Sequence, residues 1–501
     1  MYKLHLIIKY LRKRIIAWWS LLAVTLCTTM VLVVISVMGG WLNMFEHSFQ
    51  GLTGDIVVES RILSGFPWYE EMIDRIEKKP GIEAAVPAIE TYGIVNIGNL
   101  KSLGVKVMGI PLDRIGRVNR FPESLWRQYN QYLDAARHTD DPKAKAALIA
   151  QANEHLAHPS FNLPLDPGVY RNNPNLSQVK GADPARYPGI ICGSSILEIH
   201  RNSAGQTVGR DASLYLLPIK VTTIAIHPGE LRVDEKNKSE EMYWVVDDSH
   251  TGLWQYDSSF VYVPFDVLQK DLQMTPEETE NVDTGEKVEQ PARTTEIDVR
   301  VKPGYDLDAA KKEVQQVVQE VMTANEARTH AFYSMPDTQT WREKQRIWID
   351  AISNEKLLTV ILFGIISIVA VFLVFCIFYM IVMEKTRDIG IIKSVGATSA
   401  GVAGIFLGYG FAIGLAGSLL GLLCSYGIVH YINELHAMLG RFFNVQIWNP
   451  EVYLFDKIPN TMSPRDIAII VPIAIVASVL GALLPALRAA RMHPVESLRW
   501  E

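Results

Sequence analysis

The side chains best suited to acid, base or metal chemistry are His227, Asp247, Asp248 and His250, which lie near one another in the sequence. Their spacing does not match the ligand separations of zinc sites. The sequence also has no GxxxxGKS/T phosphate loop and no HExxH, GxSxG or paired CxxC motif. We therefore expect a solvated polar loop at these four residues, no metal or cofactor bound by this chain, and no enzymatic activity of its own.

A second candidate is the segment 384–398, EKTRDIGIIKSVGAT, which mixes charged residues with Ile389, Ile391, Ile392 and Val395. An apolar stripe on a short helix is costly to leave in water, so a groove on a soluble partner is a natural place for it. The simpler alternative is an ordinary basic loop beside a membrane, which binds anionic lipid head groups.

Four long apolar blocks must position this segment, one near the start of the chain and three near the end. Each is long enough to cross the hydrocarbon layer, which needs about 20 apolar residues in a helix. The blocks predict transmembrane helices over 15–45, 357–383, 400–432 and 467–487.

The third predicted helix is rich in glycine. Its glycines form three pairs with small-xxx-small spacing, a pattern that lets helices approach closely. We therefore expect helix packing at Gly404, Gly408, Gly410, Gly414, Gly417 and Gly421.

Basic residues beside the apolar blocks predict the orientation. They cluster in an amphipathic N-terminal segment 1–14, in the loop 384–398 and in the tail 488–501. The positive-inside rule places all three in the cytoplasm and leaves 46–356 and the loop 433–466 outside. A cleaved signal peptide is the alternative for the N-terminus, although the first block is long for one.

The predicted outer domain is of α+β composition and reads as two nested parts. Residues 46–112 and 290–345 each carry strand and helix patterns of a β-α-β kind, and a β-rich part over 189–289 is inserted between them. Cys192 is the only cysteine outside the predicted spans, so no disulfide is expected within this domain.

Residues 113–188 differ in composition and predict an insertion of loops and helices, with helices over 122–136 and 142–157. We expect local packing, with a docking element for an external partner as the alternative. The fold class is thus an α+β membrane protein with four transmembrane helices and a large two-part domain between the first and second.

Two segments carry a resemblance to a known family. Residues 384–398 closely resemble the coupling segment of FtsX-like permeases of the MacB and LolC/LolE group, and Leu484–Arg499 is similar to that family's closing motif. Val246–Pro264 and the run Trp341–Glu343 resemble the lipoprotein-releasing permeases more than macrolide-type exporters. The insertion after Pro111 departs from the usual pattern.

The resemblance implies a membrane subunit of an ATP-binding-cassette complex in the cell inner membrane. The partners would be a soluble dimeric ATPase, which binds ATP and Mg²⁺, a second or related permease, lipoprotein cargo, membrane lipid and a periplasmic carrier. A coupling helix would pass nucleotide-driven motion to the outer domain. It would contact the ATPase through Glu384, Arg387, Asp388, Ile389, Gly390, Ile391, Lys393, Gly396 and Ala397.

For the cargo, the apolar outer end of the first span offers Val37, Met38, Trp41, Leu42 and Phe45. Interfacial anchoring of Trp41 and Phe45 is the alternative to cargo contact. Lipoprotein extraction is the favoured function. The alternatives are a MacB-like efflux or peptide-export permease and an FtsX-like device that signals to a cell-wall hydrolase.

Overall fold

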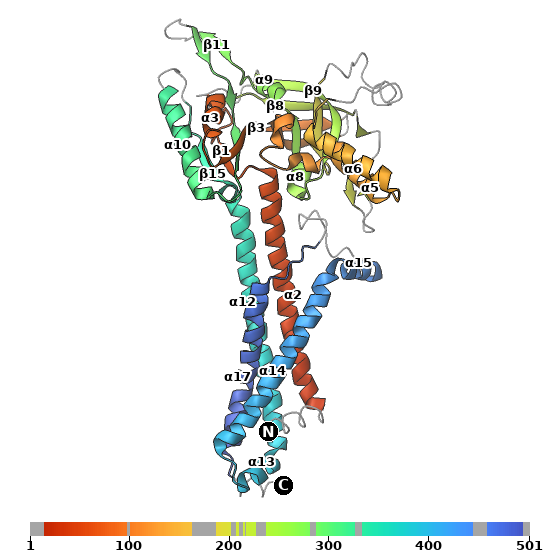
Figure 1. Ribbon diagram of the computed structural model, residues 1–501, viewed down its shortest axis with the longest axis vertical. Helices are drawn as coiled ribbons and strands as arrows, with labels where there is room; N and C mark the ends of the chain where they lie inside the picture. Colours follow the sequence, from red (N-terminus) through yellow and green to blue (C-terminus); the bar gives the residue numbers. More distant parts are fainter. Residues whose placement is uncertain are drawn as a thin grey trace. The chain divides into compact units, whose positions relative to one another are not determined.

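The computed structural model describes residues 15–97, 101–162, 187–201, 207–209, 214–215, 217–226, 237–280, 287–325, 333–443 and 458–493. It divides into two compact units (Figure 1). The helical unit comprises Met1–Phe45, Trp348–Trp448 and Lys457–Glu501, and the sheet unit comprises Glu46–Ile347 and Asn449–Asp456. The expected cytoplasmic segment 1–14 lies outside the described residues, as do parts of the insertion, the 433–466 loop and the C-terminal tail.

Within the described ranges, four helices have the length and apolar composition needed to cross a membrane: Trp18–Leu52 within α2 (Ile15–Leu52), α12 (Arg346–Glu384), α14 (Ser399–His430) and α17 (Pro464–Arg491). Three of them include the predicted apolar block and extend further, because a helix continues into polar sequence until a cap or turn ends it. Helix α14 begins at Ser399 but ends at His430, two residues before the predicted end at 432. The unit also contains α13 (Thr386–Ser394) and α15 (Ile432–Phe443). Sequence reasoning missed α15, which lies in the expected loop 433–466.

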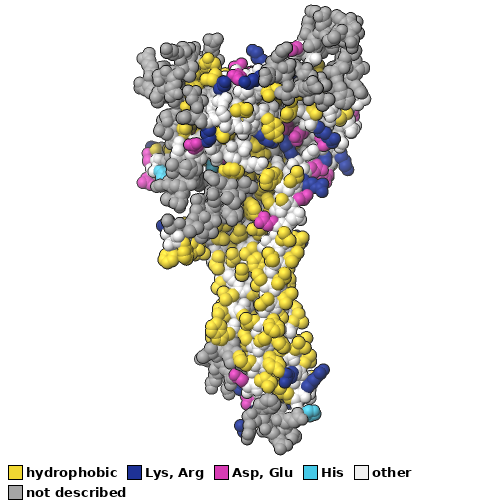
Figure 2. Space-filling view, turned by 180° about the vertical axis from the view of Figure 1, so that it is seen from behind, with side chains coloured by type: hydrophobic (Ala, Val, Ile, Leu, Met, Phe, Trp, Pro, Cys, Tyr) yellow, Lys and Arg dark blue, Asp and Glu magenta, His cyan; other side chains and the backbone are white. Residues whose placement is uncertain are grey.

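Glycines set the closest contacts within the helical unit. A Cβ atom built at Gly410 would lie 2.7 Å from Ala482 Cβ of α17, and one at Gly417 would lie 2.8 Å from Val24 Cγ1 of α2. Gly481 of α17 approaches α12 in the same way, 3.0 Å from Val371 O. The outward surface of this unit is mostly hydrophobic, with charged side chains gathered toward its end (Figure 2).

The sheet unit is built on nine strands in the order β15-β1-β14-β3-β4-β10-β5-β9-β8. Their bounds are β15 (Asp337–Thr340), β1 (Ile56–Glu59), β14 (Glu296–Val301), β3 (Ile82–Ile97), β4 (Lys101–Ile110), β10 (Phe260–Pro264), β5 (Gly189–Gly193), β9 (Lys238–Ser249) and β8 (Pro218–Ile224). Strand β8 also pairs with β3, so the six strands from β3 to β8 form a closed ring.

The long strand β3 joins what the sequence predicted as two nested parts. Its first half pairs with β14, and its second half pairs with both β4 and β8. At Gly93 a Cβ atom would lie 2.9 Å from Thr222 O and from Val107 Cγ2, so glycine allows the strands to approach there. The arrangement differs from the expected separate β-rich insertion, because hydrogen bonds along one strand run through both parts.

Helices and short strands complete the sheet unit. The helices are α3 (Tyr69–Ile76), α4 (Leu112–Ile115), α8 (Trp254–Ser259), α9 (Phe265–Asp271), α10 (Leu307–Asn325) and α11 (Trp341–Lys344). The described residues also form three two-stranded sheets. In these, β2 (Phe66–Pro67) pairs with β13 (Arg293–Thr294), β6 (His200–Arg201) with β7 (Thr207–Val208), and β11 (Glu277–Glu280) with β12 (Lys287–Gln290). Helix α10 buries Ala310, Val314 and Val318 in a core shared with α3 and the sheet, as its apolar spacing predicts.

The described part of the insertion contains α5 (Gln131–Arg137) and α6 (Pro142–Ala157). Helix α6 has the predicted bounds. The single helix expected over 122–136 is instead three short pieces, a 3₁₀ turn at Phe121–Ser124, a π-helical turn at Trp126–Asn130 and then α5. Leu125 breaks the run, because its extended backbone forms a bridge to Ser249 of β9.

Candidate functional site

Helix α13 is the short helix expected within 384–398, and it is closed by a glycine turn. The N–H of Ala397 donates to Ile392 O at 3.1 Å, and the N–H of Gly396 donates to Lys393 O at 3.1 Å. This pair of bonds is the Schellman arrangement, which needs a left-handed residue after the helix. Gly396 has φ +106° and supplies it. Thr398 then begins α14 by accepting a bond from Gly401 N.

One face of α13 packs on the ends of the long helices. Ile389 is 3% exposed and lies in an apolar cluster with Val382, Val402, Phe406, Ala486 and Ala489, which come from α12, α14 and α17. Gly390 is also buried, and Ala397 packs at the cluster's edge. Movement of α13 therefore has to move the ends of all three helices or break this core.

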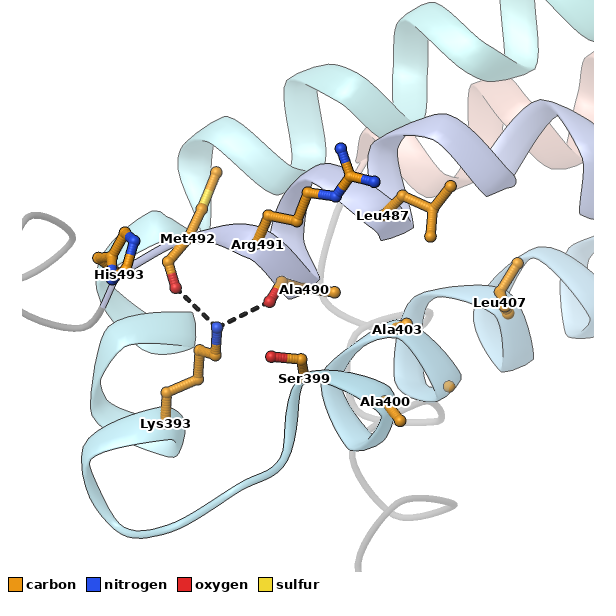
Figure 3. A pocket seen from close by; sticks show the side chains of 11 residues that line it. Lys393, Ser399, Ala400, Ala403, Leu407, Leu487, Ala490, Arg491, Met492 and His493 are labelled. Carbon is orange, nitrogen blue, oxygen red and sulfur yellow. Dashed lines mark hydrogen bonds between the residues drawn. The ribbon is translucent and has the colours of Figure 1, made fainter.

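Lys393 attaches α13 to the end of α17. Its ammonium group donates to Ala490 O at 2.8 Å and to Met492 O at 2.7 Å, as Figure 3 shows. The last carbonyls of a helix lack partners within the helix and carry partial negative charge, so a cation is favourable there. Asp388 forms a second polar contact on α13, 2.5 Å from Lys385 Nζ.

The opposite face of α13 is open. Ile391 is 47% exposed and Val395 84%, and Glu384, Arg387 and Gly396 are exposed as well. The apolar stripe expected from the sequence is therefore divided between two faces. Ile389 is not available to an external partner, because its own helical unit buries it, whereas Ile391 and Val395 remain accessible.

The glycine pairs also divide. Gly410 and Gly414 contact α17, and Gly417 and Gly421 contact α2. Gly404 has no atom within 4 Å of a built Cβ position and is exposed, and Gly408 is half-buried. Two of the three expected packing pairs therefore hold helices together, while Gly404 of the third pair leaves space.

The expected cargo surface on α2 is partly covered. Val37, Met38, Trp41 and Leu42 are half-buried, but Phe45 is only 1% exposed. Phe45 is therefore removed from the apolar surface that the sequence predicted, and the role of the other four stays a prediction.

A buried charge cluster lies in the sheet unit where α11 meets the sheet. Lys344 Nζ is 2.7 Å from Glu296 Oε1 and 3.6 Å from Glu59 Oε2. Burial alone lowers the pKa of Lys344, but the carboxylates of Glu296 and Glu59 outweigh it, so that the pKa is raised. Burial and the neighbouring Glu296 raise the pKa of Asp298. No sequence pattern predicted this cluster, because its members come from three separate segments, β1, β14 and α11.

The same region joins the two chain segments that enter and leave the sheet unit. Strand β1, which follows α2, pairs with β15, which precedes α11 and α12. Trp341 N donates to Asp55 O at 3.1 Å, and Arg342 lies 3.4 Å from Glu46. A capping box between Thr340 and Glu343 fixes the start of α11.

The structure corrects the expected polar loop at Asp247, Asp248 and His250, since both aspartates are fully buried on β9. Asp247 accepts hydrogen bonds from the N–H groups of Arg127 and Gln128, at 2.7 and 3.0 Å. Burial raises its pKa to about 7, and the neighbouring Asp248 contributes. His227 lies outside the described residues. Within the described ranges no group of three His, Cys, Asp or Glu side chains could hold a metal ion.

Comparison with protein families gives a match over the C-terminal part of the chain. The family "FtsX-like permease C-terminal" matches residues 360–494, which contain most of α12, all of α13 and α14, and α17. This part of the chain is therefore similar to the C-terminal domain of FtsX-like permeases, and α13 lies within the matched residues.

Curated relatives match the chain over only part of its length. The chain is 31% identical over 161 residues to LolC, a lipoprotein-releasing system transmembrane protein of Neisseria meningitidis, covering 32% of this chain and 39% of that one. It is 28% identical over 123 residues to LolE of Haemophilus influenzae, covering 24% and 29%. The chain thus matches about two-fifths or less of the length of these relatives.

One solved structure, the periplasmic region of MacB from Actinobacillus actinomycetemcomitans, overlaps 60% of this chain and 94% of that region. The sequence identity is 10% and the TM-score 0.27, which is too low to establish a common fold.

Proposed function

We propose that this chain is the permease subunit of an ATP-binding-cassette complex that extracts lipoproteins from the outer leaflet of the inner membrane. The named function of the LolC and LolE relatives supports this cargo. In this proposal the helical unit crosses the inner membrane, α13 faces the cytoplasm and the sheet unit faces the periplasm. The chain binds no nucleotide. ATP and Mg²⁺ bind to a separate ATPase, and a second or related permease completes the complex.

The observation that carries the proposal is the two-sided packing of α13. Its inner face is part of a core shared with α12, α14 and α17, and its outer face presents Arg387, Ile391 and Val395. An ATPase that seats Ile391 and Val395 in a groove would move the ends of three long helices together. Within the sheet unit, the pairing of β1 with β15 would carry motion of α2 and α12 to adjacent strands.

The test is ATPase activity of the purified complex. Ile391→Asp should lower permease-stimulated ATP hydrolysis by at least about tenfold, because a carboxylate at this position cannot bind in an apolar groove. Ile224→Asp is the matched control, since Ile224 is 38% exposed on β8 of the sheet unit. Unchanged stimulation by the Ile391 variant, with the chain still inserted, would remove α13 as the docking helix.

Cargo is tested separately with a photo-crosslinking residue at Met38 on α2. It should capture triacylated protein, whereas the same residue at Leu423, which is 68% exposed on α14, should capture mainly lipid. Capture of a membrane-fusion adaptor or a wall hydrolase without lipidated protein would favour export or signalling instead.

A further inference from the structure

A groove of about 790 Å³ opens at the end of the helical unit, next to α13 (Figure 3). One wall is the first part of α14, with Ala400, Ala403, Gly404 and Leu407, and the other is the end of α17. The small residues leave the space, since a Cβ atom at Gly404 would meet nothing within 4 Å. The volume is in the range of small-molecule sites, which is about 300 to 1,000 Å³.

The walls change character along the groove. Leu407 lies two turns into α14, and Leu487 lies one turn before the end of α17, so these apolar side chains lie on the span side. Lys393, Arg491 and His493 lie toward the helix ends. A groove of this kind is apolar toward the membrane interior and cationic where lipid head groups begin.

Two features at the cationic end favour a phosphate group. Arg491 is exposed, and its guanidinium group makes no hydrogen bond or ion pair with the part of the chain that the structure describes. Lys393 directs two of its three ammonium hydrogens to the carbonyls of α17, which leaves one for a ligand. The first turn of α14, which adds partial positive charge from its N–H groups, borders the same space.

We propose that this groove binds an anionic phospholipid of the adjoining leaflet, with its phosphate at Arg491 and Lys393 and one acyl chain along Leu407 and Leu487. The cationic end of the groove matches the phosphate, and the apolar end matches the acyl chain. Basic pockets between membrane helices bind lipid head groups of this kind. The ligand would contact both α14 and α17 next to α13. It would therefore stabilise the ends of the two helices on which α13 packs. The proposal requires that the helices cross a membrane, but not that the cargo is a lipoprotein.

The experiment is native mass spectrometry of the detergent-purified chain with dioleoyl phosphatidylglycerol, dioleoyl phosphatidylcholine or inorganic phosphate. Phosphatidylglycerol should bind at least about tenfold more tightly than phosphatidylcholine. Arg491→Gln should remove most of that difference, whereas Arg491→Lys should retain it. Gly404→Phe should block binding of either lipid in the groove by filling it.

Two matched variants serve as controls. Arg465→Gln changes an exposed arginine at the opposite end of α17, and Gly427→Phe changes another α14 glycine with open space around it. Neither should alter lipid binding. Circular dichroism and gel filtration of each variant show whether it is folded.

Several results would overturn the proposal. Equal binding of the two lipids would show that the head group is not recognised, and equal losses in the control variants would show that the lipid lies elsewhere. Tight binding of inorganic phosphate, equal to that of the lipid, would make the groove a simple anion site. If no lipid binds but a cysteine at Ala400 cross-links two copies of the chain, the groove is an interface between copies.

Discussion

At the scale of single residues, Lys344 is the group whose loss should matter most to the sheet unit. Its side chain is 15% exposed, and its ammonium group compensates the buried carboxylate of Glu296. Lys344→Met should destabilise the sheet unit by about 3 to 5 kcal/mol, because removing one partner leaves a buried charge without compensation. The measurement is calorimetry of the detergent-solubilised chain.

Lys101→Met is the control for that variant. Lys101 pairs with Glu198 at 2.9 Å, but both side chains are more than a third exposed, so its loss should cost less than about 1 kcal/mol. Adding Glu296→Gln to Lys344→Met should restore part of the stability. Equal effects of the two lysine variants would mean that the buried pair has no special role.

The buried carboxyl group of Asp247 should make the stability of the sheet unit depend on pH. Its pKa is raised to about 7, and burial also raises the pKa of Asp271, to about 6. A carboxyl with a raised pKa in the folded state favours folding below the unfolded pKa of about 4, and that contribution is lost as the pH rises through the folded value. The sheet unit should therefore unfold at a higher temperature at pH 5 than at pH 8.

The variant Asp247→Asn should flatten this dependence, although the new amide also faces N–H donors and lowers stability at every pH. Asp113→Asn, at an exposed carboxylate of α4, should leave the slope unchanged. The measurement is the melting temperature of each variant at four pH values between 5 and 8. A melting temperature that rises over this range would contradict the assigned role of the buried carboxyls.

At the scale of elements, the helical unit depends on glycine contacts between α14 and its neighbours. Gly417→Leu would drive a side chain into Val24 of α2, where even a Cβ atom would lie 2.8 Å away. We expect a loss of about 1 to 3 kcal/mol, the usual cost of overpacking. Gly427→Leu places the same side chain on the same helix in open space and should cost nothing measurable. Thermal stability in detergent distinguishes the two.

At the scale of the whole molecule, the sheet unit contains its own core. Its two apolar clusters, which include Ile56, Val107 and Val263 in one and Phe121 and Tyr262 in the other, draw all their buried members from residues between 56 and 322. Expressed alone, Glu46–Ile347 should therefore be soluble and unfold in one cooperative transition. Insoluble protein, or a gradual transition, would show that its core needs the helical unit.

Much of the architecture could be read from local patterns. The apolar blocks marked the four long helices, and β-rich composition marked β3 and β10. Helical spacing marked α10, because burial of one helix face imposes a period on the sequence. Helix α6 was predicted to the residue, and the proline at its start is a typical helix-start signal. Helix α15 was missed, since its Glu434, His436 and Arg441 break the apolar run that span prediction relies on.

Long-range contacts could not be read in the same way. Local composition determined that 384–398 would form a short helix with an apolar side, but only the tertiary structure decided that Ile389 faces inward and Ile391 outward. Likewise, Asp247 looked like a solvated residue until β9 was paired with β5 and β8. A sequence pattern records which residues avoid water, whereas the partner that covers each of them depends on contacts between segments that are separate in the sequence.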